Sequence, residues 1–163
     1  MARWSANETT WTPTAVADTT NYTDAGYMAL QGGSSTQFSN IVEVYMGGQA
    51  GASSPSIMLV ARDSTVGATL SVGRLSALSP FTAALAAPPV VFNTATTKPQ
   101  RSSTLSLLNL SFNAFGGIVR WVNGPDEIIS SLGNTASLGE LSLNAFTGGT
   151  PGALMSNIVL ETL

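Results

Sequence analysis

Apolar and polar residues alternate with a period of two in several short stretches of this chain. The clearest case is residues 139–146, in which Leu141, Leu143 and Ala145 alternate with polar residues. Because successive side chains of a β-strand point to opposite faces, such alternation predicts strands that bury one face. Residues typical of turns, Gly, Pro, Ser and Asn, cluster between these runs. The predicted strands are residues 25–31, 38–46, 56–62, 68–75, 90–94, 104–112, 118–122, 139–146 and 154–163.

The same period assigns side chains to faces. In residues 38–46, strict alternation places one set of side chains on each face: Val42, Val44 and Met46 on one, and Ile41, Glu43 and Tyr45 on the other. In the last predicted strand, one face carries the alternating set Ile158, Leu160 and Thr162. Three acidic residues occupy strand positions that the pattern turns outward, so we expect solvated carboxylates rather than a catalytic pair. They are Glu43, Glu140 and Glu161.

Residues 104–122 contain two strand-like runs joined by a short Asn-Ala-Phe-Gly-Gly connection. We expect the two runs to form the central hairpin of the fold. Trp121 alternates with Val119 and is expected to face the core. Arg120 then faces the opposite way, toward solvent or toward an acid such as Glu43.

The number and spacing of the predicted strands indicate an all-β domain. At most one short helical turn competes, at residues 79–87, and residues 95–103 are predicted to be an exposed loop. Strands that follow one another every 8–15 residues or so are typical of antiparallel β-sandwiches and barrels. Because several connections are long, a jelly roll is the preferred topology, and an immunoglobulin-like sandwich is the alternative.

Residues 1–24 differ from the rest of the chain, being rich in Thr, Asn and Ala. We expect an extended N-terminal arm here, followed by a β-sandwich domain at residues 25–163. Trp4 and Trp11 are the candidate partner-contact residues, because aromatic side chains bury large areas at interfaces. The alternative is that the segment packs its tryptophans onto its own domain. If the arm is free, deleting it leaves the domain folded and abolishes partner binding.

The composition argues against catalysis. Among the 163 residues there is no Cys and no His, and only 9% of the residues are charged. The commonest general base, the commonest metal ligand and a thiol nucleophile are therefore missing. We predict that the protein is not an enzyme and has no catalytic residues, no metal site and no cofactor. Without His, we also expect little change in stability between pH 6 and 8.

The charge and the aromatic residues narrow the partners. The formal net charge of −3 and the few basic residues do not predict nucleic-acid binding. No apolar run approaches the length of about 18 residues that spans a membrane, so no membrane association is expected. Exposed aromatic side chains often form the platforms of carbohydrate-binding sandwich modules. The candidate platforms are Trp4, Trp11, Tyr22, Tyr27, Tyr45 and Trp121.

Several of these features occur together: an initiator Met without a signal sequence, a polar segment with two tryptophans, no Cys or His, and a β-rich body heavy in Ser, Thr, Ala and Gly. In this combination, and most clearly from FGGIVRW at Phe115–Trp121 to Leu163, the chain resembles the small jelly-roll decoration, or cement, proteins of tailed-bacteriophage heads. The resemblance implies a structural virion protein that binds the outer capsid surface and reinforces the lattice.

The resemblance also implies partners and a location. The major capsid protein would be the partner, and the protein would act as a homo-oligomer, a trimer or a dimer. It would be made in the host cytoplasm and lie on the capsid surface of the virion. No catalytic residues come with this family. The alternative is a carbohydrate- or receptor-binding β-sandwich module of a virion tail or fibre.

Overall fold

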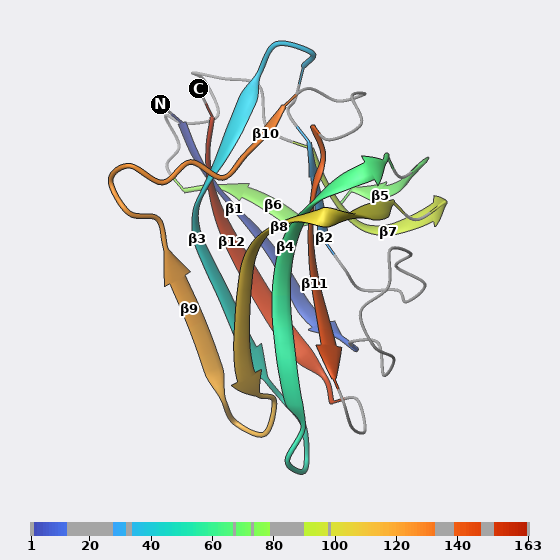
Figure 1. Cartoon of the computed structure of the whole chain (residues 1–163), viewed down its shortest axis with the longest axis vertical. Helices are drawn as coiled ribbons and strands as arrows, with labels where there is room; N and C mark the ends of the chain where they lie inside the picture. Colours follow the sequence, from blue (N-terminus) through green and yellow to red (C-terminus); the bar gives the residue numbers. More distant parts are fainter. Residues whose placement is uncertain are drawn as a thin grey trace.

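The computed structural model describes residues 2–12, 28–31, 34–66, 68–72, 74–78, 90–97, 99–132, 139–147 and 152–162. Within these residues the chain forms β-strands and their connections, as the alternation predicted (Figure 1). The strands are β1 (Ala2–Trp11), β2 (Met28–Gln31), β3 (Phe38–Gly48), β4 (Pro55–Thr65), β5 (Ala68–Val72), β6 (Arg74–Ala77), β7 (Val90–Thr97), β8 (Gln100–Asn113), β9 (Ile118–Val122), β10 (Ser130–Leu132), β11 (Leu141–Thr147) and β12 (Leu154–Thr162).

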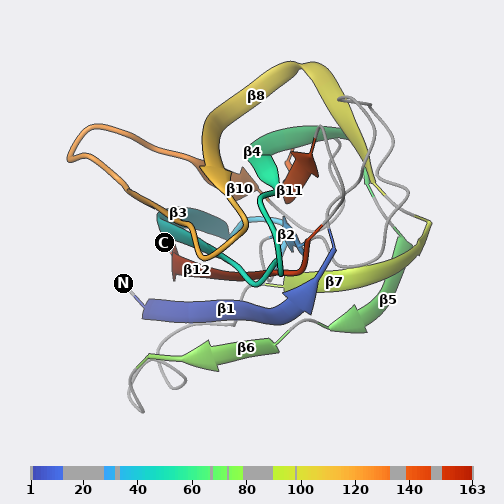
Figure 2. The same ribbon diagram turned by 90° about the horizontal axis from the view of Figure 1, so that it is seen from below.

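The strands form two antiparallel sheets that pack against each other (Figures 1 and 2). Sheet A has the order β10–β3–β12–β1–β6, and β9 also pairs with β3. Sheet B has the order β5–β7–β2–β11–β4–β8. The protein is therefore an all-β antiparallel sandwich, which confirms the fold class expected from the sequence.

The strand pairings are nested around the middle of the chain. β4 pairs with β8, β3 with β9, β2 with β11 and β1 with β12. These four pairs fall alternately in sheet B and sheet A. Two further pairings, β3 with β12 and β4 with β11, join the pairs within each sheet.

The core lies between the two sheets and is built from their inward-facing apolar side chains. Its main residues are each at most 1% exposed: Val44, Met46, Ile158 and Leu160 from sheet A, and Met58, Val60, Leu141 and Leu143 from sheet B. Thr162, at 3% exposure, shares its face with Ile158 and Leu160, which confirms the alternating set predicted for the last strand. Truncating one such core Leu or Ile to Ala typically costs about 2–5 kcal/mol.

A β-bulge in β3 explains why strict alternation failed at Ile41. The register of β3 against β12 shifts between Glu43 and Ile41, which leaves Val42 as the extra residue. A bulge changes the phase of the side-chain alternation by one residue. Ile41 is therefore fully buried in the same core as Val44, and its predicted placement on the opposite face was wrong.

Residues 104–122 do not form the predicted hairpin. β8 pairs with β4 at the edge of sheet B, whereas β9 pairs with β3 in sheet A. The chain crosses between the sheets at residues 114–117, where Ala114 is fully buried. Gly48 passes so close to this crossing that a Cβ there would lie 2.0 Å from the backbone oxygen of Ala114. The predicted face of Trp121 is confirmed, because its partly buried side chain packs against the core.

The loop predicted at residues 95–103 was wrong, because β7 extends to Thr97 and β8 begins at Gln100. Arg101 within it is only 3% exposed. The helical turn predicted at residues 79–87 lies outside the described residues.

Candidate functional site

The N-terminal segment is part of the sandwich. β1 lies inside sheet A, paired with β12 on one side and β6 on the other. Trp4 is 6% exposed and belongs to the core, so it does not offer itself to a partner. The predicted free arm is therefore wrong for residues 2–11, and the alternative of packing onto the same domain is correct for Trp4. The backbone of Trp11 pairs with Leu154, while the side chain of Trp11 and residues 13–24 lie outside the described part.

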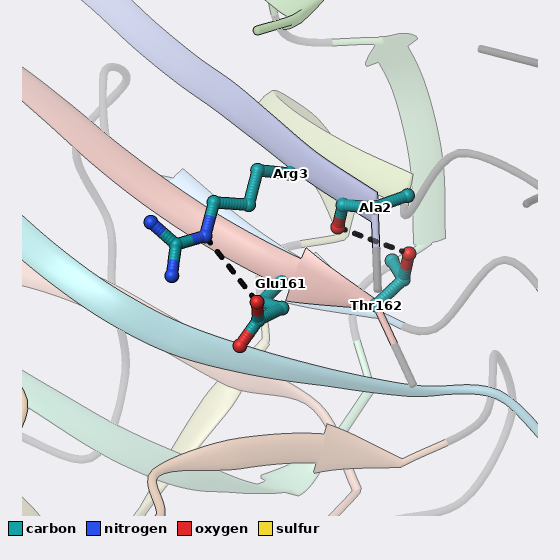
Figure 3. Close-up of polar contacts among 4 residues, drawn as sticks. All are labelled: Ala2, Arg3, Glu161 and Thr162. Atoms are coloured by element: carbon teal, nitrogen blue, oxygen red, sulfur yellow. Dashed lines mark hydrogen bonds and ion pairs between the residues drawn. The ribbon is translucent and has the colours of Figure 1, made fainter. Parts of the chain in front are cut away.

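A short alternation in the sequence could have revealed β1. The buried residues Ala2, Trp4 and Ala6 alternate with more exposed polar residues. The first and last strands are then joined by side chains as well as backbone: the Arg3 Nε lies 3.3 Å from the Glu161 Oε1, and the Thr162 hydroxyl donates to the Ala2 carbonyl at 3.3 Å (Figure 3). Deleting residues 1–24 would remove an internal strand, so we expect loss of folding instead of a folded, binding-deficient domain.

A row of polar side chains crosses sheet B. Gln31 of β2 donates from Nε2 to the Oε2 of Glu140, which directly precedes β11. The backbone N–H of Asp63 in β4 donates to the Glu140 carbonyl at 3.1 Å, and Asp63 is in register with Arg101 of β8. The Ser142 hydroxyl donates to the Asp63 Oδ1 at 2.6 Å. These five residues, termed the polar row, are each at most 5% exposed.

The polar row lies on the face of sheet B that is turned away from the core. Met58 and Val60 of β4 face the core. Ala61 and Asp63 lie at the alternate positions of the strand and therefore both face away from the core. Glu140 was predicted to be a solvated outward residue. The predicted solvation of Glu140 was wrong, because Glu140 is 1% exposed and the outer face of sheet B is buried at the polar row.

Burial raises the pKa of the Asp63 carboxyl to about 9. The hydrogen bond from Ser142 and the charge of Arg101 act to lower this pKa, and the neighbouring Glu140 acts to raise it. Asp63 is therefore protonated at neutral pH. This corrects the expectation of a flat stability between pH 6 and 8, which considered only the missing His.

The polar row is closed to solvent in this structure. Acid–base catalysis by a carboxyl pair needs both groups within reach of a substrate. Asp63 is 0% exposed and Glu140 1%, so neither carboxyl reaches the surface. We interpret the row as a link across four strands of sheet B, since it spans β2, β11, β4 and β8.

The outer face of sheet A, by contrast, is open around β9 and carries large apolar side chains. Ile118 is 62% exposed, Val122 52% and Met155 38%. The strand register places Ile118 and Met155 on either side of Gly47 in β3. The β9 surface is defined here by the outward residues of β3, β9 and β12: Tyr45, Ile118, Val122, Met155 and Val159.

Gly47 keeps the β9 surface flat. A Cβ at Gly47 would lie 3.3 Å from the Met155 Cγ and 3.8 Å from the Tyr45 Cε1. These two side chains therefore close over the glycine from either side. The absent side chain leaves Met155, Tyr45 and Ile118 grouped around one point of the sheet.

One ion pair lies within this surface. The Arg120 Nε donates to the Glu43 Oε1 at 2.6 Å, which confirms the predicted orientation of Arg120 toward an acid such as Glu43. The hydrogen bond to Glu43 raises the pKa of Arg120. Both side chains remain partly open to solvent, so the pair adds local charge balance more than stability.

The candidate aromatic platforms are not brought together. Trp4 is buried and Trp121 is partly buried against the core, whereas Tyr45 belongs to the open β9 surface. Tyr22, Tyr27 and the side chain of Trp11 lie outside the described residues. Among the candidate platforms whose side chains the structure describes, Tyr45 is therefore the one that lies on an open face.

In the described part of the chain, no group of three or more acidic side chains is placed to hold a metal ion. None of the described segments is a helix of the length and hydrophobicity needed to cross a bilayer. Comparison of the chain with models of known protein families and with curated proteins gives no match.

Proposed function

We propose that this protein is a structural virion protein that binds the outer surface of a tailed-phage capsid and stabilises its lattice. The observation that carries the proposal is the β9 surface, an open apolar face with Ile118 and Val122 more than half exposed. Contiguous exposed apolar residues on a folded domain mark sites of contact with other proteins. The major capsid protein is the proposed partner, and weak contacts repeated over a lattice gain strength from avidity.

We also propose that the sandwich is a jelly roll. The nested pairing of β1 with β12, β2 with β11, β3 with β9 and β4 with β8 supports this topology, because a jelly roll is built from two Greek keys in two facing sheets. Viral capsid and lectin domains use this architecture. β5, β6 and β7 are then additions between the fourth and fifth strands of the roll.

Capsid binding tests the proposed function. Purified protein is mixed with expanded capsids of the phage that encodes it, and the bound fraction is measured by co-sedimentation. We expect saturable binding that is weakened at least about tenfold by Met155→Asp, because the substitution places a charge in the β9 surface. The matched control is Ile57→Asp, since Ile57 of β4 is 50% exposed but belongs to sheet B.

A second measurement tests the stabilising role. Capsids with bound protein should release their DNA at a higher temperature than bare capsids, and the Met155→Asp variant should remove this difference. Saturable binding by neither the wild type nor the control would overturn the proposal. Equal binding by all three proteins would retain a capsid role and exclude the β9 surface as its site.

The alternative function is a carbohydrate- or receptor-binding module of a virion tail or fibre. Tyr45 favours it, because this aromatic residue lies on the open face in register with Arg120 and Asn157, which offer polar groups beside the ring. Glycan-array binding that disappears in Tyr45→Ala would support the alternative. Absence of glycan binding together with capsid binding would exclude it.

A further inference from the structure

β9 has one edge that no other strand in the described part of the chain pairs with. In an antiparallel ladder, opposite residues alternate between hydrogen-bonded and non-hydrogen-bonded pairs. The Gly48 N–H donates to the Gly117 carbonyl and the Asn123 N–H to the Val42 carbonyl, both at 2.9 Å, at the two ends of the β3–β9 ladder.

These end bonds fix the direction of every backbone group between them. In the register of the ladder, Val119 and Trp121 form the hydrogen-bonded pairs with β3. Ile118, Arg120 and Val122 therefore direct their N–H and C=O groups away from β3. The same three residues have exposed side chains, so that backbone and side chains are both accessible along this edge.

The free edge of β9 differs from that of β8. The Ala114 N–H donates to the Ser54 carbonyl at 2.8 Å, so the outward backbone groups of β8 belong to Asn109, Ser111 and Asn113. These are polar residues. The β9 edge carries two β-branched apolar residues and neither Pro nor Lys, and the charge of its Arg120 is balanced by Glu43, so this edge is less protected against pairing than that of β8.

We propose that the free edge of β9 pairs antiparallel with β9 of a second copy of this chain, which joins sheet A of both copies into one continuous sheet. The outward residues are symmetric about Arg120, so a two-fold axis at Arg120 matches each outward N–H with an outward C=O. Ile118 then lies opposite Val122 of the second copy, a favourable pair of β-branched side chains. Such a self-complementary contact is typical of two-fold dimers.

The charge on the strand is compatible with this register. Arg120 would lie opposite Arg120 of the second copy, which is unfavourable for bare charges. Each Arg120 is already paired with its own Glu43 at 2.6 Å, so the central row carries no net charge. The other charged residues described on this face, Arg3 and Glu161, pair with each other on β1 and β12. A second copy is therefore favoured over a strongly charged partner segment.

The contact is small, which predicts a weak dimer that depends on concentration. The inference rests on the proposed function in one respect: that function expects a homo-oligomer, and the β9 edge is the interface proposed for it. Its test uses the purified protein alone. A failure of dimerisation and a failure of capsid binding are therefore distinguishable.

The experiment is sedimentation equilibrium over a range of concentrations up to about the millimolar level expected for a weak interface. The mass of the wild type should rise from that of one chain, 16.7 kDa, toward twice this value. Val122→Pro removes an outward N–H and leaves the β3 ladder intact, since edge strands tolerate Pro on their solvent side. It should raise the dissociation constant at least about tenfold.

Two control variants keep the test specific. Val122→Thr retains the N–H and the β-branched shape, and should dimerise as the wild type does. Ser111→Pro removes an outward N–H from the edge of β8 and should also leave the dimer intact. Circular dichroism melts of all variants check that a lost dimer does not reflect a lost fold.

Hydrogen exchange gives an independent readout. At high concentration the amides of Ile118, Arg120 and Val122 should become protected, while those of Val119 and Trp121 should be protected at all concentrations. A wild type that remains monomeric, a trimer unaffected by Val122→Pro, or equal dimerisation of all variants would overturn the proposal. Capsid binding lost in Val122→Pro, with a monomeric wild type, would overturn it too and assign the edge to a capsid strand.

Discussion

The outer faces of the two sheets differ in which side chains are exposed to solvent. Sheet A leaves its outer face open, with Ile118, Val122 and Met155 between 38% and 62% exposed. Sheet B buries its outer face at the polar row, although Ile57 farther along β4 is 50% exposed. Apolar residues are thus exposed around β9, whereas ionisable residues are buried at the polar row.

Residues that hold the fold together are thus distinguished from residues that are available to contact another molecule. Buried polar groups are costly unless they are hydrogen-bonded, and hydrogen bonds join Gln31, Glu140, Asp63 and Ser142, although the Asp63 Oδ2 has no partner. Exposed apolar residues contribute little to the fold of one chain and favour association with another surface. Both sheets supply the core, and the proposed function places partner binding on the β9 surface of sheet A.

The largest expected difference comes from placing a lysine on each outer face. Ala61→Lys should destabilise the protein by about 3–5 kcal/mol, because Ala61 is 0% exposed and the site has no space for a long charged side chain. Ile118→Lys should change stability by less than about 0.5 kcal/mol. Urea denaturation measures the free energy of unfolding of both variants and of the wild type. Similar destabilisation by the two substitutions would remove the distinction between the sheets.

The pH dependence of stability reports on the polar row. The pKa of Asp63 is raised from 3.8 when unfolded to about 9 when folded. Between these values the folded state retains a proton that the unfolded state has lost, so the stabilisation from this group is complete below about pH 4 and declines as the pH rises toward 9.

From pH 6 to 8 we therefore expect the free energy of unfolding to fall by roughly 1.4 kcal/mol per pH unit, measured by urea denaturation at each pH. Asp63→Asn, which keeps the shape and cannot titrate, should show a flat profile over the same range. A flat wild-type profile, or an equal slope in the variant, would contradict this account of Asp63.

Two serine hydrogen bonds, one in each sheet, allow the same comparison for single interactions. Ser142 donates to Asp63 at 2.6 Å inside the polar row, and Ser5 donates to the Asn157 Oδ1 at 2.8 Å on sheet A. Ser142→Ala should cost about 1–3 kcal/mol because it leaves a buried acceptor without its donor. Ser5→Ala should cost less than about 1 kcal/mol, since its site is only partly buried. Thermal melts compare the two, and a larger loss from Ser5→Ala would count against the assignment.

The smallest effect is expected at the ion pair of the β9 surface. Arg120→Gln removes the contact with Glu43, but both groups are partly solvated, so the melting temperature should not change measurably. The same substitution should change the salt dependence of partner binding, which sedimentation at low and high salt measures. A clear drop in melting temperature would show that this pair supports the fold as well.

Local patterning predicted a large part of the structure. The alternation of β12 gave the buried set Ile158, Leu160 and Thr162, and that of β9 gave the opposed orientations of Trp121 and Arg120. The partner of Arg120 was foreseen because Glu43 was an acid on a neighbouring outward face. The all-β class followed from the same evidence, since the period of two is a property of the strand itself.

The errors arose where the outcome depends on distant parts of the chain. The alternation of Ala2, Trp4 and Ala6 is a short signal for β1, and the pairing of β1 with β12 and β6 depends on distant parts of the chain. The bulge at Val42 reverses the phase of β3 in response to its partner strand. The supposed hairpin of residues 104–122 splits between the sheets because the chain crosses at Ala114.

By itself, then, the sequence determined most of the strands and most of the side chains that share a face, because both depend on the geometry of a few neighbouring residues. The tertiary structure alone decided which faces are covered. Glu140 and Ile118 show the consequence: an acid became buried and an isoleucine exposed, although each lies on the face that alternation predicts. Burial depends on what packs above a face, and no local pattern records that.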